Sequence, residues 1–546
     1  MTAERFDAVD LSILWERLVS ITDEGATALI RTSFSTLVRE GFDLSILIFD
    51  AAGRMIAQST KCIPVFIGTA PVTLSHMLMK FGGKLKPGDV VVSNDPTIGT
   101  GHMYDLAVMR PIFRNGEIAG YAMSITHLPD IGGMGFSVSA REIYHEGLRL
   151  PILKLVKEGV LDEDIVELIR LNVRVSDQVM GDIHASIAAS AVVARQVLDF
   201  MEEYDLASLT PLADEILAQT EAAVRTALAA LPDAEYTSET DVEAHEEVRT
   251  LKCRINKAGE SLTIDFEGTG PCVGAGINVP FPYTRSMALY AIKCLTTPDI
   301  PNNDGSTVPI TVTAPVGSIL NAVPPAASAG RHTIGHFVVP LIYAAMAEIV
   351  PDRVTAASGL TDIMTIQGRH ADGSELSATY FAAGGFGGLD GLDGRQTTPG
   401  SSNIGTTPIE VFEPLSGLLV EKKALRPDSG GAGQFRGGAG QTIVLRNATG
   451  HPMTVFSMAN RTQFPAEGLF GGKAGALREH LIDGEPVSGQ GRHTLMPDGR
   501  LTLNQAGGGG YGPPAKRPTA AVRADLEAGF LSPDGAARAY GVRWDD

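Results

Sequence analysis

The sequence predicts a multidomain α+β protein with a hairpin-rich N-terminal region, a central helical block and a glycine-rich C-terminal half that contains β-strands. The chain has 546 residues, more than one hydrophobic core usually serves, so two to four domains are expected. It is 44% hydrophobic and 20% charged, as globular proteins are. The expected strands come in hairpins and the expected helices come in a block, which favours α+β over an alternating, doubly wound sheet.

The first 160 residues are expected to hold a helix followed by strands. Apolar residues recur at spacings of three and four within the first forty residues, which predicts a helix. Residues 44–58 have the pattern of a hairpin, and residues 88–96 that of a buried strand ending in a turn. Residues 111–126 form a second expected hairpin across Asn115-Gly116, a dipeptide typical of the type I′ turn.

The rest of the chain divides into a helical block and two regions with strands. The helical pattern begins near 161 and ends at the break Leu231-Pro232, after which strand-like alternation returns. Helices are expected at about 284–295 and 334–350, short strands with many glycines beyond 370, and two short helices near the C-terminus. The expected domains are 1–160, 161–233, 234–425 and 426–546.

The bulk composition argues against several classes of function. The formal net charge of −19 is spread along the chain, and such an acidic surface repels the phosphates of nucleic acids. The four cysteines form no C-x-x-C pair, and the opening residues carry charge where a signal peptide needs an apolar core, so a cytoplasmic protein is expected. The longest apolar stretch, 338–350, is too short to span a bilayer, and no membrane association is expected.

The candidate chemistry lies in two H-x-x-D units, His102 with Asp105 and His127 with Asp130. Imidazole nitrogens and carboxylate oxygens suit a divalent ion such as Zn²⁺, Mn²⁺ or Fe²⁺, and the lack of a thiolate disfavours a closed structural zinc site. Each unit lies where an expected strand meets a glycine-rich loop, and the second hairpin would make those strands neighbours. The pattern indicates a metal-binding hairpin region, although both histidines could instead cap loops.

Other histidines admit two interpretations. His145 and its neighbour Glu146 could contact a substrate, or they could close a loop structurally. Arg331, His332 and His336 could be mistaken for a metal pair on a helix, but they begin the apolar helix expected at 334–350, where packing or capping is the favoured role.

The glycine runs invite a phosphate-binding interpretation that their pattern does not support. The runs at 384–388, 429–440 and 507–512 do not match G-x-x-x-x-G-K-[ST], and close backbone packing or tight loops are favoured. The sequence therefore contains no recognisable nucleotide site. It also lacks the G-x-S-x-G motif of serine hydrolases.

Several long motifs follow one another along nearly the whole chain: NDPTIGTGH, H-x-x-DIGG, AREIYHEGLRLPILKL, GDIHASIAA, LTIDFEGTG, PDIPNNDGSTVPITVTAPVGSILN, RPDSGGAGQFRGGAG and GLFGGKAGA. Together they closely resemble the hydantoinase B/oxoprolinase family. This family includes B subunits of N-methylhydantoinase and caprolactamase-type lactamases, the C-terminal portion of 5-oxoprolinase, and one subunit of the acetone and acetophenone carboxylases.

The resemblance implies a set of site residues. In metal-bearing relatives the ligands fall on His102, Asp105 and His127, and lactamase-type members add an early aspartate, which the motif REGFDLSILIFD places at Asp43. Asp130 is then a candidate to orient a ligand or to act as a base. The chain departs from many relatives at Cys62 and Phe66, where they have histidines, so its substrate choice could be unusual.

The resemblance also implies a function and a partner. The chain would be the metal-binding subunit of an ATP-dependent hydrolase that opens a hydantoin, lactam or 5-oxoproline ring. A hydantoinase A-type partner of the actin-like ATPase kind would bind ATP and Mg²⁺, giving a hetero-oligomer. The alternatives are a subunit of an ATP-dependent ketone carboxylase, whose subunits tend to be longer, a non-catalytic scaffold, and a stand-alone metal amidase.

Overall fold

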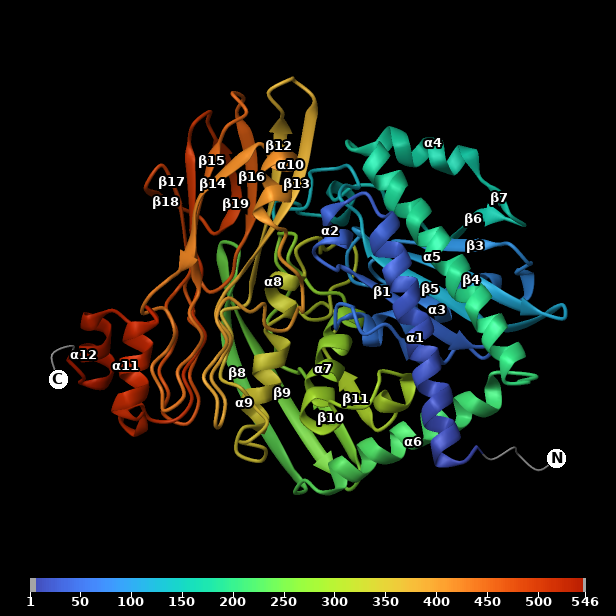
Figure 1. Cartoon of the computed structure of the whole chain (residues 1–546), viewed down its shortest axis with the longest axis horizontal. Helices are drawn as coiled ribbons and strands as arrows, with labels where there is room; N and C mark the ends of the chain where they lie inside the picture. The colour runs from blue at the N-terminus through green and yellow to red at the C-terminus, as the bar shows by residue number, and fades with distance from the viewer. Residues whose placement is uncertain (1–5, 544–546) are drawn as a thin grey trace.

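The computed structural model describes residues 6–543, which form several sheets with helices packed against them (Figure 1). The expected multidomain α+β architecture is confirmed. Residues 1–5, which belong to the opening segment that argued against a signal peptide, lie outside the described residues. No helix among residues 6–543 is long and apolar enough to cross a membrane.

The N-terminal region is built on a seven-stranded antiparallel sheet. Its strands are β1 (Leu44–Asp50), β2 (Met55–Gln58), β3 (Val90–Ser93), β4 (Asp105–Arg114), β5 (Glu117–His127), β6 (Leu153–Lys157) and β7 (Val160–Leu161), in the order β2-β1-β5-β4-β3-β6-β7. Both expected hairpins are confirmed, since β1 pairs with β2 and β4 with β5. Asn115 and Gly116 have φ of 52° and 84°, as a type I′ turn requires.

Helices cover both faces of this sheet. They are α1 (Ala8–Thr32), α2 (Thr36–Arg39), α3 (Phe66–Phe81) and, from the helical block, α4 (Glu163–Asn172), α5 (Ser176–Glu203) and α6 (Thr210–Ala229). The expected block is confirmed, and α5 runs beside α1 across the sheet (Figure 1). Ile46 and Ile48 of β1 pack towards α1 and α5, whereas Leu47 and Phe49 pack with α3. Because both faces are buried, the apolar residues 46–49 of β1 follow one another without polar alternation.

A second sheet with neighbouring helices follows. It contains β8 (Ala234–Ala244), β9 (Glu247–Ala258), β10 (Ser261–Asp265) and β11 (Ile310–Thr313), in the order β11-β10-β9-β8. The helices are α7 (Phe281–Thr296), α8 (His332–Gly335) and α9 (Val338–Met346). The single helix expected at 334–350 is therefore two shorter helices that meet at His336 and Phe337.

The C-terminal third adds two more antiparallel sheets and two terminal helices. One has the order β13-β12-β16-β19 and the other β14-β15-β20-β17-β18. Their elements are β12 (Thr361–Arg369), β13 (Glu375–Ala383), α10 (Ile409–Ser416), β14 (Leu418–Leu425), β15 (Gln441–Asn447), β16 (Met453–Met458), β17 (Glu479–Ile482), β18 (Glu485–Val487), β19 (Gln490–Leu495), β20 (Arg500–Asn504), α11 (Thr519–Glu527) and α12 (Pro533–Tyr540). The division into four domains stays a prediction; both sheets pair strands from the two sides of the boundary expected at residue 425.

Extended glycine-rich segments lie between these sheets and the terminal helices α11 and α12 (Figure 1). The segment 506–510 bonds through its backbone to segments 384–388 and 430–438 and to Ala357 and Lys473. A Cβ on Gly385 would lie 1.8 Å from the carbonyl oxygen of Gly438, and one on Gly507 would lie 1.7 Å from that of Ser429. Glycine is required here because backbones approach this closely, which confirms close packing as the reason for the glycine runs. We call this region the glycine array.

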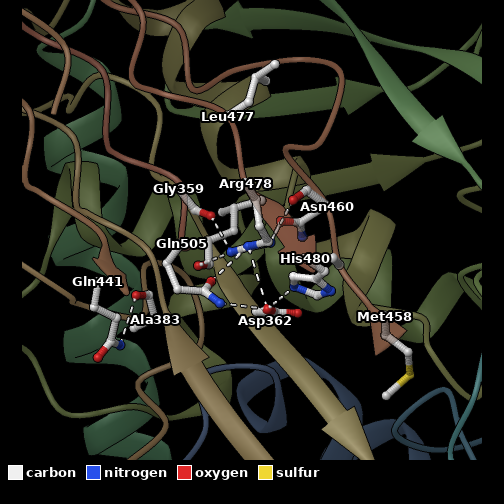
Figure 2. Close-up of polar contacts among 12 residues, drawn as sticks. Gly359, Asp362, Ala383, Gln441, Met458, Asn460, Leu477, Arg478, His480 and Gln505 are labelled. Carbon is white, nitrogen blue, oxygen red and sulfur yellow. Dashed lines mark hydrogen bonds and ion pairs between the residues drawn. The ribbon is translucent and has the colours of Figure 1, made fainter. Parts of the chain in front are cut away.

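A cluster of buried polar side chains joins the two C-terminal sheets (Figure 2). His480 Nε2 lies 2.8 Å from Asp362 Oδ2, and Gln505 donates to the same oxygen at 2.7 Å. The fully buried Arg478 donates to Gln505, to Asn460 and to two backbone carbonyls. We call this group of Asp362, Asn460, Arg478, His480 and Gln505 the Arg478 cluster.

Candidate metal centre

Strand pairing brings the predicted ligands to one end of the N-terminal sheet. Asp105 begins β4 and His127 ends β5, and the register places them directly opposite each other. Asp43 precedes β1, the other neighbour of β5, and its carbonyl accepts a hydrogen bond from the backbone N–H of His127 at 3.2 Å. His102 lies on the loop just before β4. Four residues from three chain segments therefore meet where neighbouring strands end.

The side chains of these residues converge on one point. The ligand atoms of His102, Asp105 and His127 all lie within 4.8 Å of one another, and all three residues are buried. Asp105 Oδ1 is 3.0 Å from His102 Nε2 and 3.3 Å from His127 Nδ1. Asp43 Oδ2 is 3.5 Å from His127 Nδ1. Zinc is held by nitrogen and carboxylate oxygen atoms at roughly 2.0–2.2 Å, so one ion could reach all three side chains after small adjustments.

The hydrogen bonding of His102 shows that the site suits a cation. Its Nδ1 lies 3.0 Å from the carbonyl oxygen of Ala329, which can only accept, so Nδ1 carries the proton. In a neutral ring Nε2 then presents a lone pair, and it faces a carboxylate oxygen of Asp105. Among residues 6–543, neither of these two buried atoms makes a hydrogen bond of good geometry. Two facing acceptors repel each other unless a positive charge lies between them, and a ligand histidine typically donates its other N–H to a backbone carbonyl in this way.

The surrounding charges favour a neutral His102 and an ionised Asp105. Burial, with a contribution from Arg331, lowers the pKa of His102 from 6.5 to about 3. Burial would raise the pKa of Asp105, but the adjacent Arg331 guanidinium favours the ionised carboxylate, and the pKa lies well below its usual range. Arg331 donates to Asp105 Oδ2 at 2.8 Å. Burial raises the pKa of Asp43 from 3.8 to about 6.

The ligands line a compact cavity of about 50 Å³. Its other walls are mostly apolar and include Phe66 and Phe136, together with residues from the C-terminal third such as Ile363 and Phe381. Phe66, one of the two departures from the family pattern, thus faces the site directly. The second departure, Cys62, is not part of this wall.

Arg331, His332 and His336 also line this cavity, whereas the sequence favoured packing or capping for them. Their side chains are buried, and within the described part of the chain neither His332 Nε2 nor His336 Nδ1 has a hydrogen-bond partner. Burial lowers the pKa of His336 to about 3 and that of His332 further below its usual range, so both rings are neutral. Their R-H-x-x-x-H spacing was the available signal, but nothing in the sequence places them beside residues more than 200 positions earlier.

The two residues predicted to be catalytic lie in different surroundings. Asp130 is buried and accepts two hydrogen bonds from Arg174, one from the backbone at 2.5 Å and one from the guanidinium at 2.7 Å. His145 is exposed, whereas its neighbour Glu146 is fully buried. Neither Asp130 nor His145 lines the cavity. Their catalytic roles stay predictions.

Comparison with known proteins places this chain in a family. The Hydantoinase B/oxoprolinase family profile matches residues 7–514. The chain is 30% identical to an uncharacterised protein of Methanocaldococcus jannaschii, over 98% of this chain and 96% of that one. It is 28% identical to the caprolactamase subunit beta of Pseudomonas jessenii, over 98% and 96%. It is also 29% identical to the 5-oxoprolinase PfmaA of Pestalotiopsis fici, over 94% of this chain but 42% of that longer protein.

Solved structures share the fold. The crystal structure of the ATP-dependent caprolactamase from Pseudomonas jessenii superimposes with a TM-score of 0.92 at 26% identity, covering 99% of this chain and 97% of that one. A nucleotide-free acetone carboxylase structure gives a TM-score of 0.90 at 19% identity, covering 98% and 80%. At that lower identity the second likeness shows a common fold.

Proposed function

The chain belongs to the hydantoinase B/oxoprolinase family, and we propose that it is the metal-binding subunit of an ATP-dependent hydrolase that opens small cyclic amides. The observation that carries the proposal is the pair of acceptors His102 Nε2 and Asp105 Oδ1, which face each other at 3.0 Å in a buried site and make no hydrogen bond of good geometry with residues 6–543. The names of the relatives, which include a caprolactamase and a 5-oxoprolinase, support the C–N bond of a cyclic amide as the bond that is cleaved.

In this proposal His102, Asp105 and His127 hold a divalent ion such as Zn²⁺, Mn²⁺ or Fe²⁺, with Asp43 as a fourth ligand. When bound, the ion would act as a Lewis acid that stabilises negative charge developing on oxygen. Arg331 holds Asp105 in place and balances part of its charge. Asp43, with its raised pKa, lies at the edge of the group and would have to lose its proton to join it.

The cavity walls would prepare the ring for attack. Phe66, Phe136 and Phe381 give the cavity apolar walls, and apolar walls that keep water out would strengthen electrostatic interactions inside the site. His332 Nε2 and His336 Nδ1 belong to neutral imidazoles that line the cavity, and they have no hydrogen-bond partner among the described residues. A ring amide has one donor, its N–H, and one acceptor, its C=O. These imidazoles can satisfy both, because each neutral ring has one donor and one acceptor nitrogen.

An amide is a poor electrophile, and phosphorylation of its oxygen by ATP would provide a better leaving group. The sequence has no recognisable nucleotide motif, so ATP and Mg²⁺ are assigned to a partner of the hydantoinase A type, an actin-like ATPase. Two observations support a partner: the caprolactamase relative is named a subunit, and the 5-oxoprolinase relative is more than twice the length that this chain matches. We therefore expect a hetero-oligomer.

The test compares His102→Ala with the control His451→Ala, which changes an exposed histidine outside the cavity. Each protein is purified with its ATPase partner, and bound metal and ATP-dependent opening of ε-caprolactam, hydantoin and 5-oxoproline are measured. We expect His102→Ala to lose metal and turnover, and His451→Ala to keep both. Full metal content and activity in His102→Ala would refute the metal assignment.

The acetone carboxylase fold supports a second candidate, a subunit of an ATP-dependent ketone carboxylase. The same preparation supplied with acetone, bicarbonate and ATP separates the two candidates. Consumption of bicarbonate without opening of any cyclic amide would favour the carboxylase. A metal-free parent without turnover in either assay would favour a non-catalytic scaffold.

A further inference from the structure

One loop, residues 325–331, closes the metal centre from a distant part of the chain. The carbonyl of Ala329 accepts the hydrogen bond from His102 Nδ1 at 3.0 Å. Arg331 donates to Asp105 Oδ2 at 2.8 Å and to the carbonyl of Thr100 at 2.5 Å. Two of the three proposed ligands are thus oriented by this loop, which lies more than 220 residues further along the chain.

A buried carboxylate holds this loop in place. Glu146 Oε1 accepts hydrogen bonds from the backbone N–H groups of Ser328 at 2.6 Å and Ala329 at 2.5 Å. Glu146 is 0% exposed. It follows the short helix η2 (Ile143–His145), which lies against the start of the same loop: Ile143 N–H donates to the carbonyl of Pro325 at 2.9 Å. Three hydrogen bonds therefore fix the segment that contains Glu146 to the loop.

We propose that Glu146 is a positioning residue of the metal centre. By fixing the peptide of Ala329, it holds the carbonyl that keeps the proton of His102 on Nδ1 and aims Nε2 at the ion. Glu146 acts through Ala329 and touches neither ligand nor substrate. Partners of this outer kind typically contribute about 10–100-fold to metal affinity. The proposal rests on the proposed metal site and adds a residue that neither the H-x-x-D motif nor the cavity lining includes.

The chain contains a matched control. Glu243 is also buried, at 2% exposure, and its Oε1 accepts hydrogen bonds from two consecutive backbone N–H groups, those of Gln463 at 2.6 Å and Phe464 at 3.2 Å. In both residues Oε2 has no hydrogen-bond partner among residues 6–543. Glu243 holds a different loop and does not line the metal cavity. Loss of either set of carboxylate–backbone hydrogen bonds should lower the stability of the fold. Only loss of the Glu146 hydrogen bonds should alter the metal centre.

The experiment uses the full chain and four variants: Glu146→Met, which removes the acceptor at similar volume, Glu146→Gln, which keeps an acceptor, Glu146→Asp, which shortens the arm, and Glu243→Met. Zn²⁺ affinity is measured by competition with a chromophoric chelator. The absorption spectrum of the Co²⁺-loaded protein reports the ligand geometry, and thermal unfolding reports stability.

We expect Glu146→Met to bind Zn²⁺ about 10–100-fold more weakly than the parent, with an altered Co²⁺ spectrum. Glu146→Gln should stay close to the parent and Glu146→Asp should be intermediate; these two still test the role if Glu146→Met does not fold. Glu243→Met should lose thermal stability yet keep the parent's Zn²⁺ affinity and Co²⁺ spectrum.

Parent-like affinity in Glu146→Met would overturn the assignment, and so would parent-like affinity in Glu146→Asp where Glu146→Met does not fold, or an equal loss of affinity in Glu243→Met. A parent protein that binds neither Zn²⁺ nor Co²⁺ would refute the proposed metal site itself. Because that result appears already in the parent, it is distinguishable from failure of the Glu146 role alone.

Discussion

The metal centre and the Arg478 cluster both bury a histidine against an aspartate, but their charges differ. In the Arg478 cluster one carboxylate, that of Asp362, lies near one guanidinium, that of Arg478. This guanidinium also donates hydrogen bonds to the side chains of Gln505 and Asn460 and to the carbonyl of Gly359. In the metal centre two carboxylates, Asp43 and Asp105, share the one guanidinium of Arg331. The first group has one carboxylate for one guanidinium, whereas the second has two carboxylates for one guanidinium, with the ring of His127 between those carboxylates. Of these two buried His–Asp pairs, we therefore expect the one with the surplus of carboxylates to bind a cation.

The largest effect is expected when the Arg478 cluster loses its carboxylate. Asp362→Leu leaves the Arg478 guanidinium buried without a counter-charge, so we expect the free energy of unfolding to fall by about 3–5 kcal/mol. Urea unfolding of the metal-free protein measures the loss. Zn²⁺ affinity should stay at the parent's value, and a parallel loss of affinity would contradict the independence of the two groups.

A pH series should reveal the unbalanced charge of the metal centre. The pKa of Asp43 rises from 3.8 to about 6 on folding, so the folded protein retains this proton more tightly than the unfolded chain does. Stability from protonated Asp43 is present at low pH and is lost as pH rises from about 4 through about 6, by at most about 3 kcal/mol. Urea unfolding of the metal-free protein across this window measures the loss. In Asp43→Asn this component should vanish; an unchanged pH profile would exclude Asp43 as its source.

The smallest expected effect is stabilisation of the protein by Zn²⁺ bound at the metal centre. Zn²⁺ at 100 times its dissociation constant should stabilise the protein by about 2.7 kcal/mol, measured as a shift in the urea midpoint. The same increment should appear in Asp362→Leu, because the Arg478 cluster takes no part in binding. Asp105→Asn should show no increment at that concentration, since it loses a ligand while Asp43 remains to balance Arg331. Equal stabilisation of Asp105→Asn would place the ion elsewhere.

The sequence predicted one half of the metal centre better than the other. Asn115-Gly116 fixes the hairpin, and the hairpin register brings Asp105 opposite His127, so these two ligands follow from local turn chemistry. Asp43 followed only from the family resemblance, because β1 joins β5 through a pairing that no local signal encodes. The sequence also did not place Arg331, His332 and Glu146 at the site, since their positions depend on how a distant loop packs against the hairpin.

The Arg478 cluster was not predicted, for the same physical reason. Asp362 and His480 are 118 residues apart and belong to no motif, and only the pairing of distant strands brings them together. The glycine runs were correctly assigned to close packing, but their arrangement in three dimensions was not evident. The fold class, the hairpins and the helical block could be predicted because their signals lie within short windows of sequence.

The glycine array has a consequence for how the chain reaches its native state. Its central segment, 506–510, bonds to backbone groups as far away as Ala357, so the array cannot assemble until almost the whole chain has been synthesised. Glycine has no side chain whose burial could stabilise a partly formed array, and each hydrogen bond contributes only about 0.5–1.5 kcal/mol. Contacts this distant in sequence form slowly. We expect the array to be the last region to consolidate, which would make the C-terminal third the part of a nascent chain most exposed to proteases and chaperones.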